Sequence, residues 1–203
     1  MKNFLSTLLF LTATALLLLQ TGCVTRTRPL SVPIANLDTQ TQIKLPPPTL
    51  SAPAATLYRE QLLHATANGR THTLHTVLEI DGQKIKLAGL TTLGLRLFRL
   101  TYENQSIQVE TLSRLPDKLP SPAQVLSDIM LAYWPVESWL PQLPDNWTLA
   151  DKSPSLRILL NPQNTPVLEI HYATTGTGQR ADPQKILHHI FNYEITITPI
   201  DAE

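Results

Sequence analysis

Residues 71–87 read Thr71-His72-Thr73-Leu74-His75-Thr76-Val77-Leu78-Glu79-Ile80-Asp81-Gly82-Gln83-Lys84-Ile85-Lys86-Leu87. Apolar and polar side chains alternate on both sides of Asp81-Gly82, a dipeptide that is favoured in tight hairpin turns. Leu74 and Leu78 therefore share one face of the first strand, and Leu87 continues that face after the turn. The pattern predicts an antiparallel hairpin with one buried face and one face in water.

The alternation continues after this hairpin. Residues 93–102 predict a strand that places Leu95 and Leu97 on one face, opposite Arg96 and Phe98. A polar turn then leads to a return strand through Ile107 and Val109. Together with the hairpin, these segments predict an antiparallel meander.

Strands return near the end of the chain. Residues 156–160 and 166–173 predict two of them, and a polar loop, residues 174–183, follows. His188-His189 is predicted to end a short helical turn. Residues 191–198 then alternate apolar and polar side chains more clearly than any other segment, which predicts a last strand.

The middle of the chain predicts a helix that begins at Ser121 and stops at Trp134-Pro135. Ser121 is a capping residue, Pro122 suits the first helical position, and Gln124 completes a capping box. The apolar stripe at helical spacing consists of Val125, Leu126, Ile129, Ala132 and Tyr133. The predicted fold is therefore α+β: a strongly curved antiparallel sheet, an incomplete half-barrel, wrapped around one or two helices.

The N-terminus predicts a lipid anchor. Lys2 is followed by an apolar run too short to span a bilayer, as in a cleaved signal peptide over residues 1–22. Cys23, the only cysteine, follows directly and resembles the lipidated first residue of bacterial lipoproteins, whose acyl chains give stable anchoring. By resemblance to their sorting rules, Val24 implies the periplasmic face of the outer membrane.

Residues 23–55 are rich in proline and threonine and show no sustained apolar period, which predicts an unstructured tether carrying the lipidated cysteine. Residues 56–203 are then the half-barrel domain. Without the signal segment, 15 basic residues face 16 acidic ones, so no excess of positive charge favours nucleic acid.

Catalytic and metal motifs are missing from the sequence. It contains no Gly-x-Ser-x-Gly elbow and no His-Glu-x-x-His pair. His72 and His75 would lie on opposite faces of one strand, so they do not suit a shared metal ion. We expect no enzyme activity, no metal site and no cofactor, and we expect Asp128 on the helix to have a structural role.

Two motifs resemble known envelope proteins. The first motif is Leu90-Thr91-Thr92-Leu93-Gly94-Leu95-Arg96-Leu97-Phe98-Arg99-Leu100, which resembles a strand-loop-strand of LolB, the outer-membrane receptor of lipoprotein localisation. The second is Trp139-Leu140-Pro141-Gln142-Leu143-Pro144-Asp145, which resembles a later stretch of LolB. An uncharacterised family of bacterial lipoproteins encoded among aryl polyene synthesis genes is similar at residues 121–135 and 143–147. The resemblance implies a LolB-like half-barrel with a hydrophobic cavity under its helices.

The resemblance also implies site residues. Leu93 matches the protruding leucine with which LolB engages membrane or cargo, although a strand that starts early would bury it. The candidates for lining the cavity are Leu74, Leu78, Leu87, Leu95, Leu97, Trp134, Phe191 and Tyr193. The same residues would equally form an ordinary core, and the sequence leaves both alternatives open.

Two functions follow from these expectations. The first is an outer-membrane lipoprotein that accepts an acyl-chain cargo, a lipid or a lipoprotein, from a periplasmic carrier protein. The second is a non-catalytic scaffold or assembly factor that uses the same fold, with a filled core, to dock proteins.

Overall fold

The computed structural model describes residues 32–50, 56–111 and 120–200. The predicted signal peptide, Cys23 and Val24 lie outside the described residues. In the described part, ten strands form one sheet in which every neighbouring pair is antiparallel, and α2 (Pro122–Tyr133) is the one α-helix. The expected α+β class is confirmed, and the expectation of one or two helices resolves to one.

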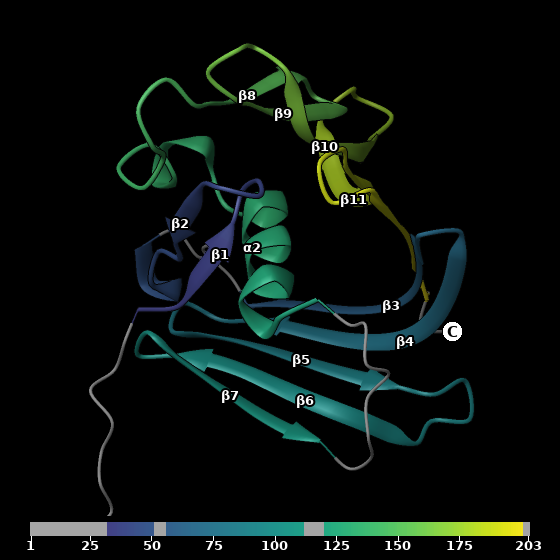
Figure 1. The fold of residues 1–203 in the computed structure, drawn as a ribbon. Helices are drawn as coiled ribbons and strands as arrows, with labels where there is room; N and C mark the ends of the chain where they lie inside the picture. Colours follow the sequence, from purple (N-terminus) through teal and green to yellow (C-terminus); the bar gives the residue numbers. More distant parts are fainter. Residues whose placement is uncertain (1–31, 51–55, 112–119, 201–203) are drawn as a thin grey trace, which may run out of the picture.

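The sheet order is β7-β6-β5-β4-β3-β12-β11-β10-β9-β8, and the two edge strands do not pair with each other. The sheet is therefore not closed, and it curves around α2 (Figure 1). The strands are β3 (Leu57–Ala67), β4 (Arg70–Ile80), β5 (Lys84–Leu90), β6 (Arg96–Glu103), β7 (Ser106–Thr111), β8 (Thr148–Ser153), β9 (Leu156–Leu160), β10 (Pro166–Thr174), β11 (Arg180–His188) and β12 (Tyr193–Pro199).

The β4–β5 hairpin forms as the alternation predicts. The Asp81 carboxylate accepts hydrogen bonds from the backbone N–H groups of Gln83 and Lys84, at 2.8 and 2.9 Å, and so shapes the turn. Leu78 pairs with Leu87, which in turn pairs with Leu100 on β6. This row of apolar side chains runs across three strands on the concave, buried face.

β6 differs from the prediction in its start and in its inward face. The strand begins at Arg96 instead of residue 93, and a register shift follows the Gly89–Phe98 pair. Leu100 and Tyr102 are buried, whereas Leu95 is 67% exposed. Alternation continued from Leu95 would have put Leu100 and Tyr102 in water, so burial of Leu100 and Tyr102, with Phe98 beside them, sets the inward face.

The α2 helix confirms the predicted boundaries. The Ser121 hydroxyl accepts a hydrogen bond from the Gln124 N–H at 3.2 Å, and Pro122 occupies the first turn. The helix ends at Tyr133, and the Trp134 N–H still reaches the Met130 carbonyl at 2.9 Å. Pro135 then begins the short 3₁₀ segment η2 (Val136–Ser138).

The prediction of an unstructured tether is wrong for residues 32–50. β1 (Ile34–Asn36) and β2 (Gln42–Lys44) form a small hairpin, followed by η1 (Pro48–Leu50). Its buried side chains, each no more than 2% exposed, are Ala35, Leu37, Ile43 and Leu45. The Tyr102 hydroxyl on β6 donates to the carbonyls of Leu45 and Pro46, so the hairpin packs on the domain and belongs to its core.

Two further predictions near the C-terminus are corrected. The expected polar loop is shorter than predicted, residues 175–179, because β11 begins at Arg180, and this strand takes the place of the helical turn and buries His188. Burial lowers the pKa of His188 to about 4, so the side chain is neutral at physiological pH and does not complement a helix dipole. β8, in a region that we expected to be loop, completes the sheet beyond β9.

The hairpin makes a testable contribution to stability. Ile43→Ala should lower the free energy of unfolding by about 2–5 kcal/mol, because it removes a buried aliphatic side chain from a closed core. Gln40→Ala, at an exposed position of the same hairpin, should change it by no more than about 0.5 kcal/mol. Chemical denaturation of both variants measures the difference, and equal stabilities would show that the hairpin does not support the fold.

Candidate functional site

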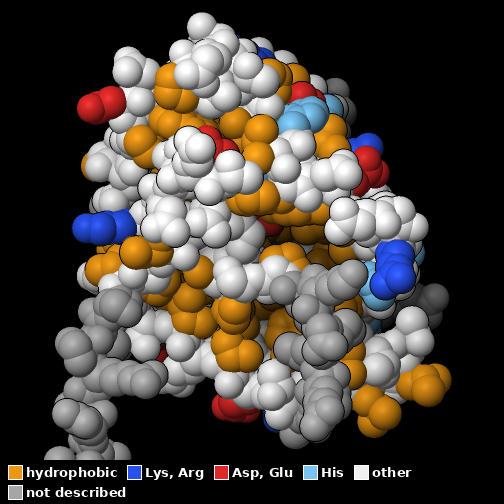
Figure 2. All heavy atoms as spheres, in the orientation of Figure 1, with side chains coloured by type: hydrophobic (Ala, Val, Ile, Leu, Met, Phe, Trp, Pro, Cys, Tyr) orange, Lys and Arg blue, Asp and Glu red, His pale blue; other side chains and the backbone are white. Residues whose placement is uncertain are grey.

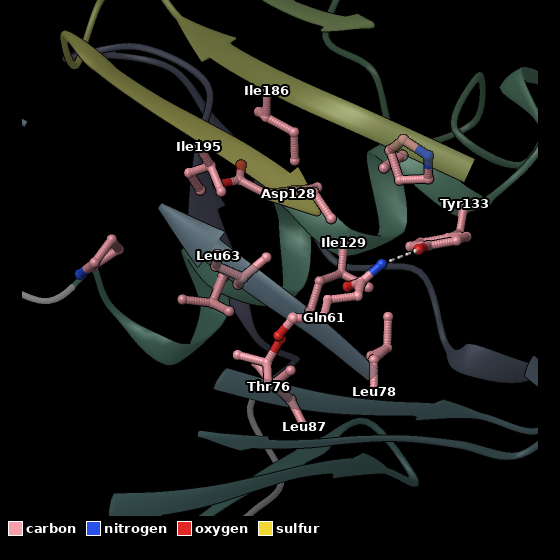
Figure 3. A pocket seen from close by; sticks show the side chains of 15 residues that line it. Gln61, Leu63, Thr76, Leu78, Leu87, Asp128, Ile129, Tyr133, Ile186 and Ile195 are labelled. Carbon is pink, nitrogen blue, oxygen red and sulfur yellow. Dashed lines mark hydrogen bonds between the residues drawn. The ribbon is translucent and has the colours of Figure 1, made fainter. Parts of the chain in front are cut away.

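A cavity of about 80 Å³ lies between α2 and the concave face of the sheet. The aliphatic side chains that line it from the sheet are Leu63, Leu78, Leu87, Ile186, Ile195 and Ile197. The helix contributes Val125, Asp128, Ile129, Ala132 and Tyr133, several of which appear in Figure 3. Hydrophobic side chains also gather across the hollow of this face in Figure 2. The chain thus holds a small, mainly apolar space under its helix.

One end of this cavity is polar. Gln61 Nε2 donates to the Tyr133 hydroxyl at 3.4 Å, and the Thr76 hydroxyl donates to the Gln61 carbonyl at 3.3 Å (Figure 3). Two positions before Gln61 on β3, Arg59 forms a two-pronged ion pair with Asp182, at 2.6 and 3.1 Å. The pair is about one third exposed and joins β3 to β11 at the rim.

A buried carboxylate lies in the wall contributed by α2. Asp128 is 4% exposed, and its two oxygens accept hydrogen bonds from the Tyr193 hydroxyl at 2.6 Å and from Gln124 Nε2 at 3.3 Å. Burial raises the pKa of Asp128 to about 7, although both hydrogen bonds lower it. Gln124 Oε1 in turn accepts from the backbone N–H of Asn36 in β1. One polar chain therefore connects the N-terminal hairpin, α2 and β12 beside the cavity.

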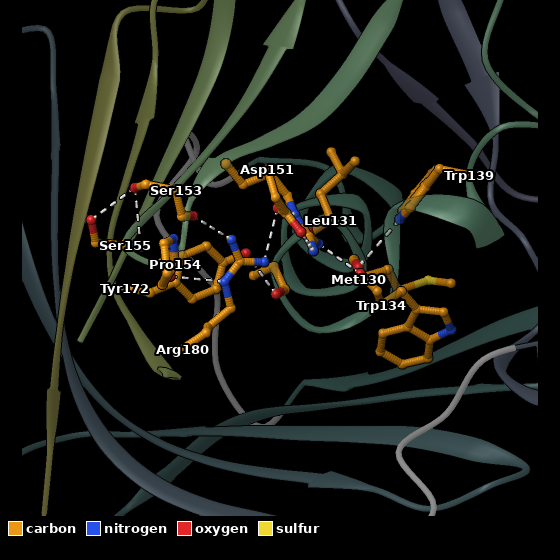
Figure 4. A network of polar contacts seen from close by, with 12 residues as sticks. Met130, Leu131, Trp134, Trp139, Asp151, Ser153, Pro154, Ser155, Tyr172 and Arg180 are labelled. Atoms are coloured by element: carbon orange, nitrogen blue, oxygen red, sulfur yellow. Dashed lines mark hydrogen bonds and ion pairs between the residues drawn. The ribbon is translucent and has the colours of Figure 1, made fainter. Parts of the chain in front are cut away.

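The opposite end of α2 is held by side chains from later in the sequence (Figure 4). Arg157 on β9 is 4% exposed, donates to the carbonyls of Leu131 and Trp134, each at 2.6 Å, and pairs with Asp151 at 2.7 Å. The Tyr172 hydroxyl donates to the Ala132 carbonyl at 2.8 Å. These bonds satisfy carbonyls that a helix C-terminus leaves without partners and so fix where α2 lies over the sheet.

Among the residues predicted to line the cavity, only Leu78 and Leu87 do so. Leu74 and the Phe98 ring both lie against Gly89, so closely that a Cβ added at Gly89 would clash with both side chains. The prediction for Leu95 and Leu97 is wrong because Leu95 precedes β6 and is exposed, and Leu97, although half-buried, is not in the lining. The structure therefore brings together only part of the predicted set.

The predicted aromatic residues have other positions. Trp134 follows α2 directly and is fully buried. Trp139, after η2, is also fully buried, and its indole N–H donates to the Met130 carbonyl. Phe191 packs its ring against His188, with ring centroids 4.4 Å apart. Tyr193 acts on the cavity only through its hydrogen bond to Asp128. None of these residues lines the cavity: the two tryptophans belong to the packed core, and Phe191 and Tyr193 are half-buried outside the lining.

Leu93 lies at an exposed tip, 87% accessible to solvent. The Thr91 N–H donates to the Leu95 carbonyl and the Gly94 N–H to the Thr91 carbonyl, each at 2.9 Å, in a tight turn between β5 and β6. Gly94 has φ +79°, a conformation that glycine adopts without strain. The alternative of a buried Leu93 is therefore wrong, and Leu93 and Leu95 form an exposed apolar pair.

The polar members of the cavity wall were not predicted as site residues. Gln61 precedes Leu63 on the inward face of β3, and Thr76 lies between Leu74 and Leu78 on that of β4, so a polar residue beside aliphatic ones could have indicated both. Asp128 sits within the apolar stripe of the helix, a comparable signal that we interpreted as structural. In the described part of the chain, no three His, Cys, Asp or Glu side chains are placed to hold a metal ion.

A family of proteins of unknown function, DUF3261, matches residues 58–201. The chain belongs to this family. The match begins at the start of β3 and covers the ten-stranded sheet and α2, but not the β1–β2 hairpin. No curated protein shows a significant match to the chain. Within the described residues, no helix is long and apolar enough to cross a bilayer.

The raised pKa of Asp128 predicts a pH-dependent stability. The folded chain keeps this proton up to about pH 7, whereas the unfolded chain loses it near pH 4. A rise in pH across that window therefore favours unfolding, by on the order of 4 kcal/mol once the pH exceeds 7. Asp128→Asn removes this cost. The free energy of unfolding of the variant minus that of the unmodified chain should therefore increase as the pH rises from about 4.5 to 8.

Denaturation curves at several pH values test this expectation. Asp145→Asn, at an exposed position, serves as the control and should show no pH-dependent difference from the unmodified chain. If the difference in free energy of unfolding between Asp128→Asn and the unmodified chain stayed constant across this range, the pKa of Asp128 would not be raised in the folded chain.

Proposed function

We propose that this chain is a non-catalytic, lipid-anchored protein of the outer membrane that accepts an acyl chain in the cavity under α2, in the manner of a LolB-like half-barrel. The observation that carries the proposal is the apolar cavity on the concave face of an open sheet, closed by one helix. Pockets for apolar ligands have this character: a mainly hydrophobic wall with a few polar groups. The cargo is an acyl chain of a lipid or a lipoprotein, delivered by a periplasmic carrier.

The cavity has to widen for this function. At about 80 Å³ it is well below the roughly 300–1,000 Å³ typical of ligand pockets. Val125, Ile129 and Tyr133 are only half-buried on the helix surface that faces it. A small displacement of the helix from the sheet would therefore extend an existing apolar wall.

The anchor part of the proposal depends on Cys23. Because the ordered hairpin begins near residue 32, the connection from Cys23 could span at most about 30 Å, at roughly 3.3–3.6 Å per residue. This is much shorter than a tether ending at residue 55 would allow. The proposal therefore places the domain close to the membrane that holds it.

The Leu93 tip supports an encounter role. An exposed apolar pair on a tight turn does not contribute to the core and suits transient contact with a bilayer or an apolar cargo. Figure 1 shows the β5–β6 connection projecting beyond the sheet. We infer that Leu93 acts there as the resemblance to LolB implies.

The small size of the cavity favours a second candidate. A scaffold or assembly factor would use the same fold as a protein-docking module and would not need its interior to open. The two candidates differ in whether an acyl chain enters the space under α2.

Acyl-chain entry is tested by photocrosslinking. The full chain in phosphatidylcholine nanodiscs is illuminated with a fatty alcohol that carries a diazirine on its chain. We expect saturable labelling of peptides around Leu78, Ile129 and Ile186, because these side chains line the cavity.

Two Ala→Leu variants test whether labelling depends on the volume of the cavity. Ala132 lines the cavity, so added carbon atoms there should reduce labelling. Ala181→Leu makes the same change at an exposed position of β11 and should leave labelling unchanged. Equal labelling of both variants, or none of the unmodified chain, would favour the docking module.

The Leu93 tip generates a separate prediction. Leu93→Glu should leave the melting temperature unchanged, since the side chain is in water, but should slow transfer of a fluorescent lipid from donor vesicles to acceptor vesicles that carry the full chain. Leu140→Glu, another exposed leucine at 58% accessibility, is the control and should transfer normally. Equal transfer by both variants would remove Leu93 from the mechanism.

A further inference from the structure

The Asp128 carboxylate gives the cavity a charge preference that the apolar wall alone would not have. Asp128 is 4% exposed and belongs to the lining, so its carboxylate borders the space that a ligand would fill. Its two hydrogen bonds use one lone pair on each oxygen and leave further acceptor positions. Figure 3 shows Asp128 in the helical wall, near Ile195.

No described residue in the lining carries a compensating positive charge. The lining contains no lysine or arginine. Arg59, just outside it, is already paired with Asp182 by two contacts. His188 packs its ring 5.0 Å from that of Tyr193, but burial keeps it neutral at physiological pH. The remaining polar groups of the wall, Gln61, Thr76 and Tyr133, are uncharged.

We propose that Asp128 makes the cavity select acyl chains whose polar end is uncharged, such as an alcohol, an ester or an amide, over free fatty acids. The inference rests on the proposed function, because it concerns the cargo of the same cavity. Above about pH 7, where Asp128 is ionised, the carboxylate of a fatty acid in or beside this space would meet a second negative charge in a poorly hydrated environment, where repulsion is stronger than in water. A hydroxyl or an amide N–H would instead donate to the free acceptor positions of Asp128.

Competition experiments test the selectivity at pH 8. The photoreactive fatty alcohol is displaced from the full chain in nanodiscs by an unlabelled fatty alcohol or by the fatty acid of the same chain length. We expect the acid to displace the photoreactive alcohol less effectively than the unlabelled alcohol does. The ratio of the concentrations that displace half of the label, acid over alcohol, should fall about tenfold in Asp128→Asn. Because the two competitors also differ in their partition into the bilayer, the change in this ratio between variants is the measurement.

Two further variants separate charge from packing. Thr76→Val replaces another polar side chain of the lining but keeps the Asp128 carboxylate and both of its hydrogen bonds, so it should keep the ratio of the unmodified chain. Asp145→Asn removes an exposed negative charge elsewhere and should also keep it. If Thr76→Val lowered the ratio as much as Asp128→Asn, the polarity of the wall in general would explain the selectivity and the proposal would be overturned.

The outcomes distinguish this inference from the function on which it rests. If the photoreactive alcohol fails to label the cavity, the acyl-acceptor function fails, and the selectivity with it. If the alcohol labels the cavity but Asp128→Asn leaves the ratio unchanged, the acceptor function stands and the role of Asp128 is wrong. A ratio that falls only in Asp128→Asn supports both.

Discussion

The C-terminus of α2 is the constraint on which the rest of this structure depends. The last carbonyls of a helix have no partners within it. Here Arg157 and Tyr172 supply partners from β9 and β10, and Trp139 supplies one from the segment after η2. The guanidinium also places a positive charge at the negative end of the helix dipole. These donors lie on strands far from β3 to β5, and the Gln61–Tyr133 hydrogen bond joins the helix to β3 as well.

The cavity lies beside the helix that these contacts hold. The helix is bound at its end by Arg157 and along its side by the Asp128–Tyr193 hydrogen bond, and residues of β3, β4 and β5 line the space that it covers. The space of about 80 Å³ is lined mainly by aliphatic side chains of the sheet and of α2. Under the proposed function, this is the part of the interior that an acyl chain would enter, whereas a docking module would leave it unused.

The sequence predicts those parts of the fold that depend on local signals. The β4–β5 hairpin and α2 follow from alternation, a turn dipeptide and a capping serine, all within a few residues of the structure that they determine. The β1–β2 hairpin was missed because each strand has three residues in a proline-rich segment, and its stability comes from burial of side chains such as Ile43 against distant strands. The inward face of β6 likewise depends on which side chains the opposite strands and α2 can bury. The cavity was not predictable because the same leucines, among them Leu78, would suit either a lining or a filled core.

The N-terminal hairpin and the exposed tip lie at opposite ends of β6. Tyr102, which receives the N-terminal hairpin, is near the end of β6, and Leu93 precedes its start. The eight residues of β6 span about 26 Å at roughly 3.3 Å per residue. A connection of at most about 30 Å from Cys23 would hold the hairpin end near the membrane. Because this reach is slightly longer than β6 itself, the proposed anchor would let the Leu93 tip meet either the anchoring bilayer or an apolar cargo, and both contacts are compatible with transfer of an acyl chain.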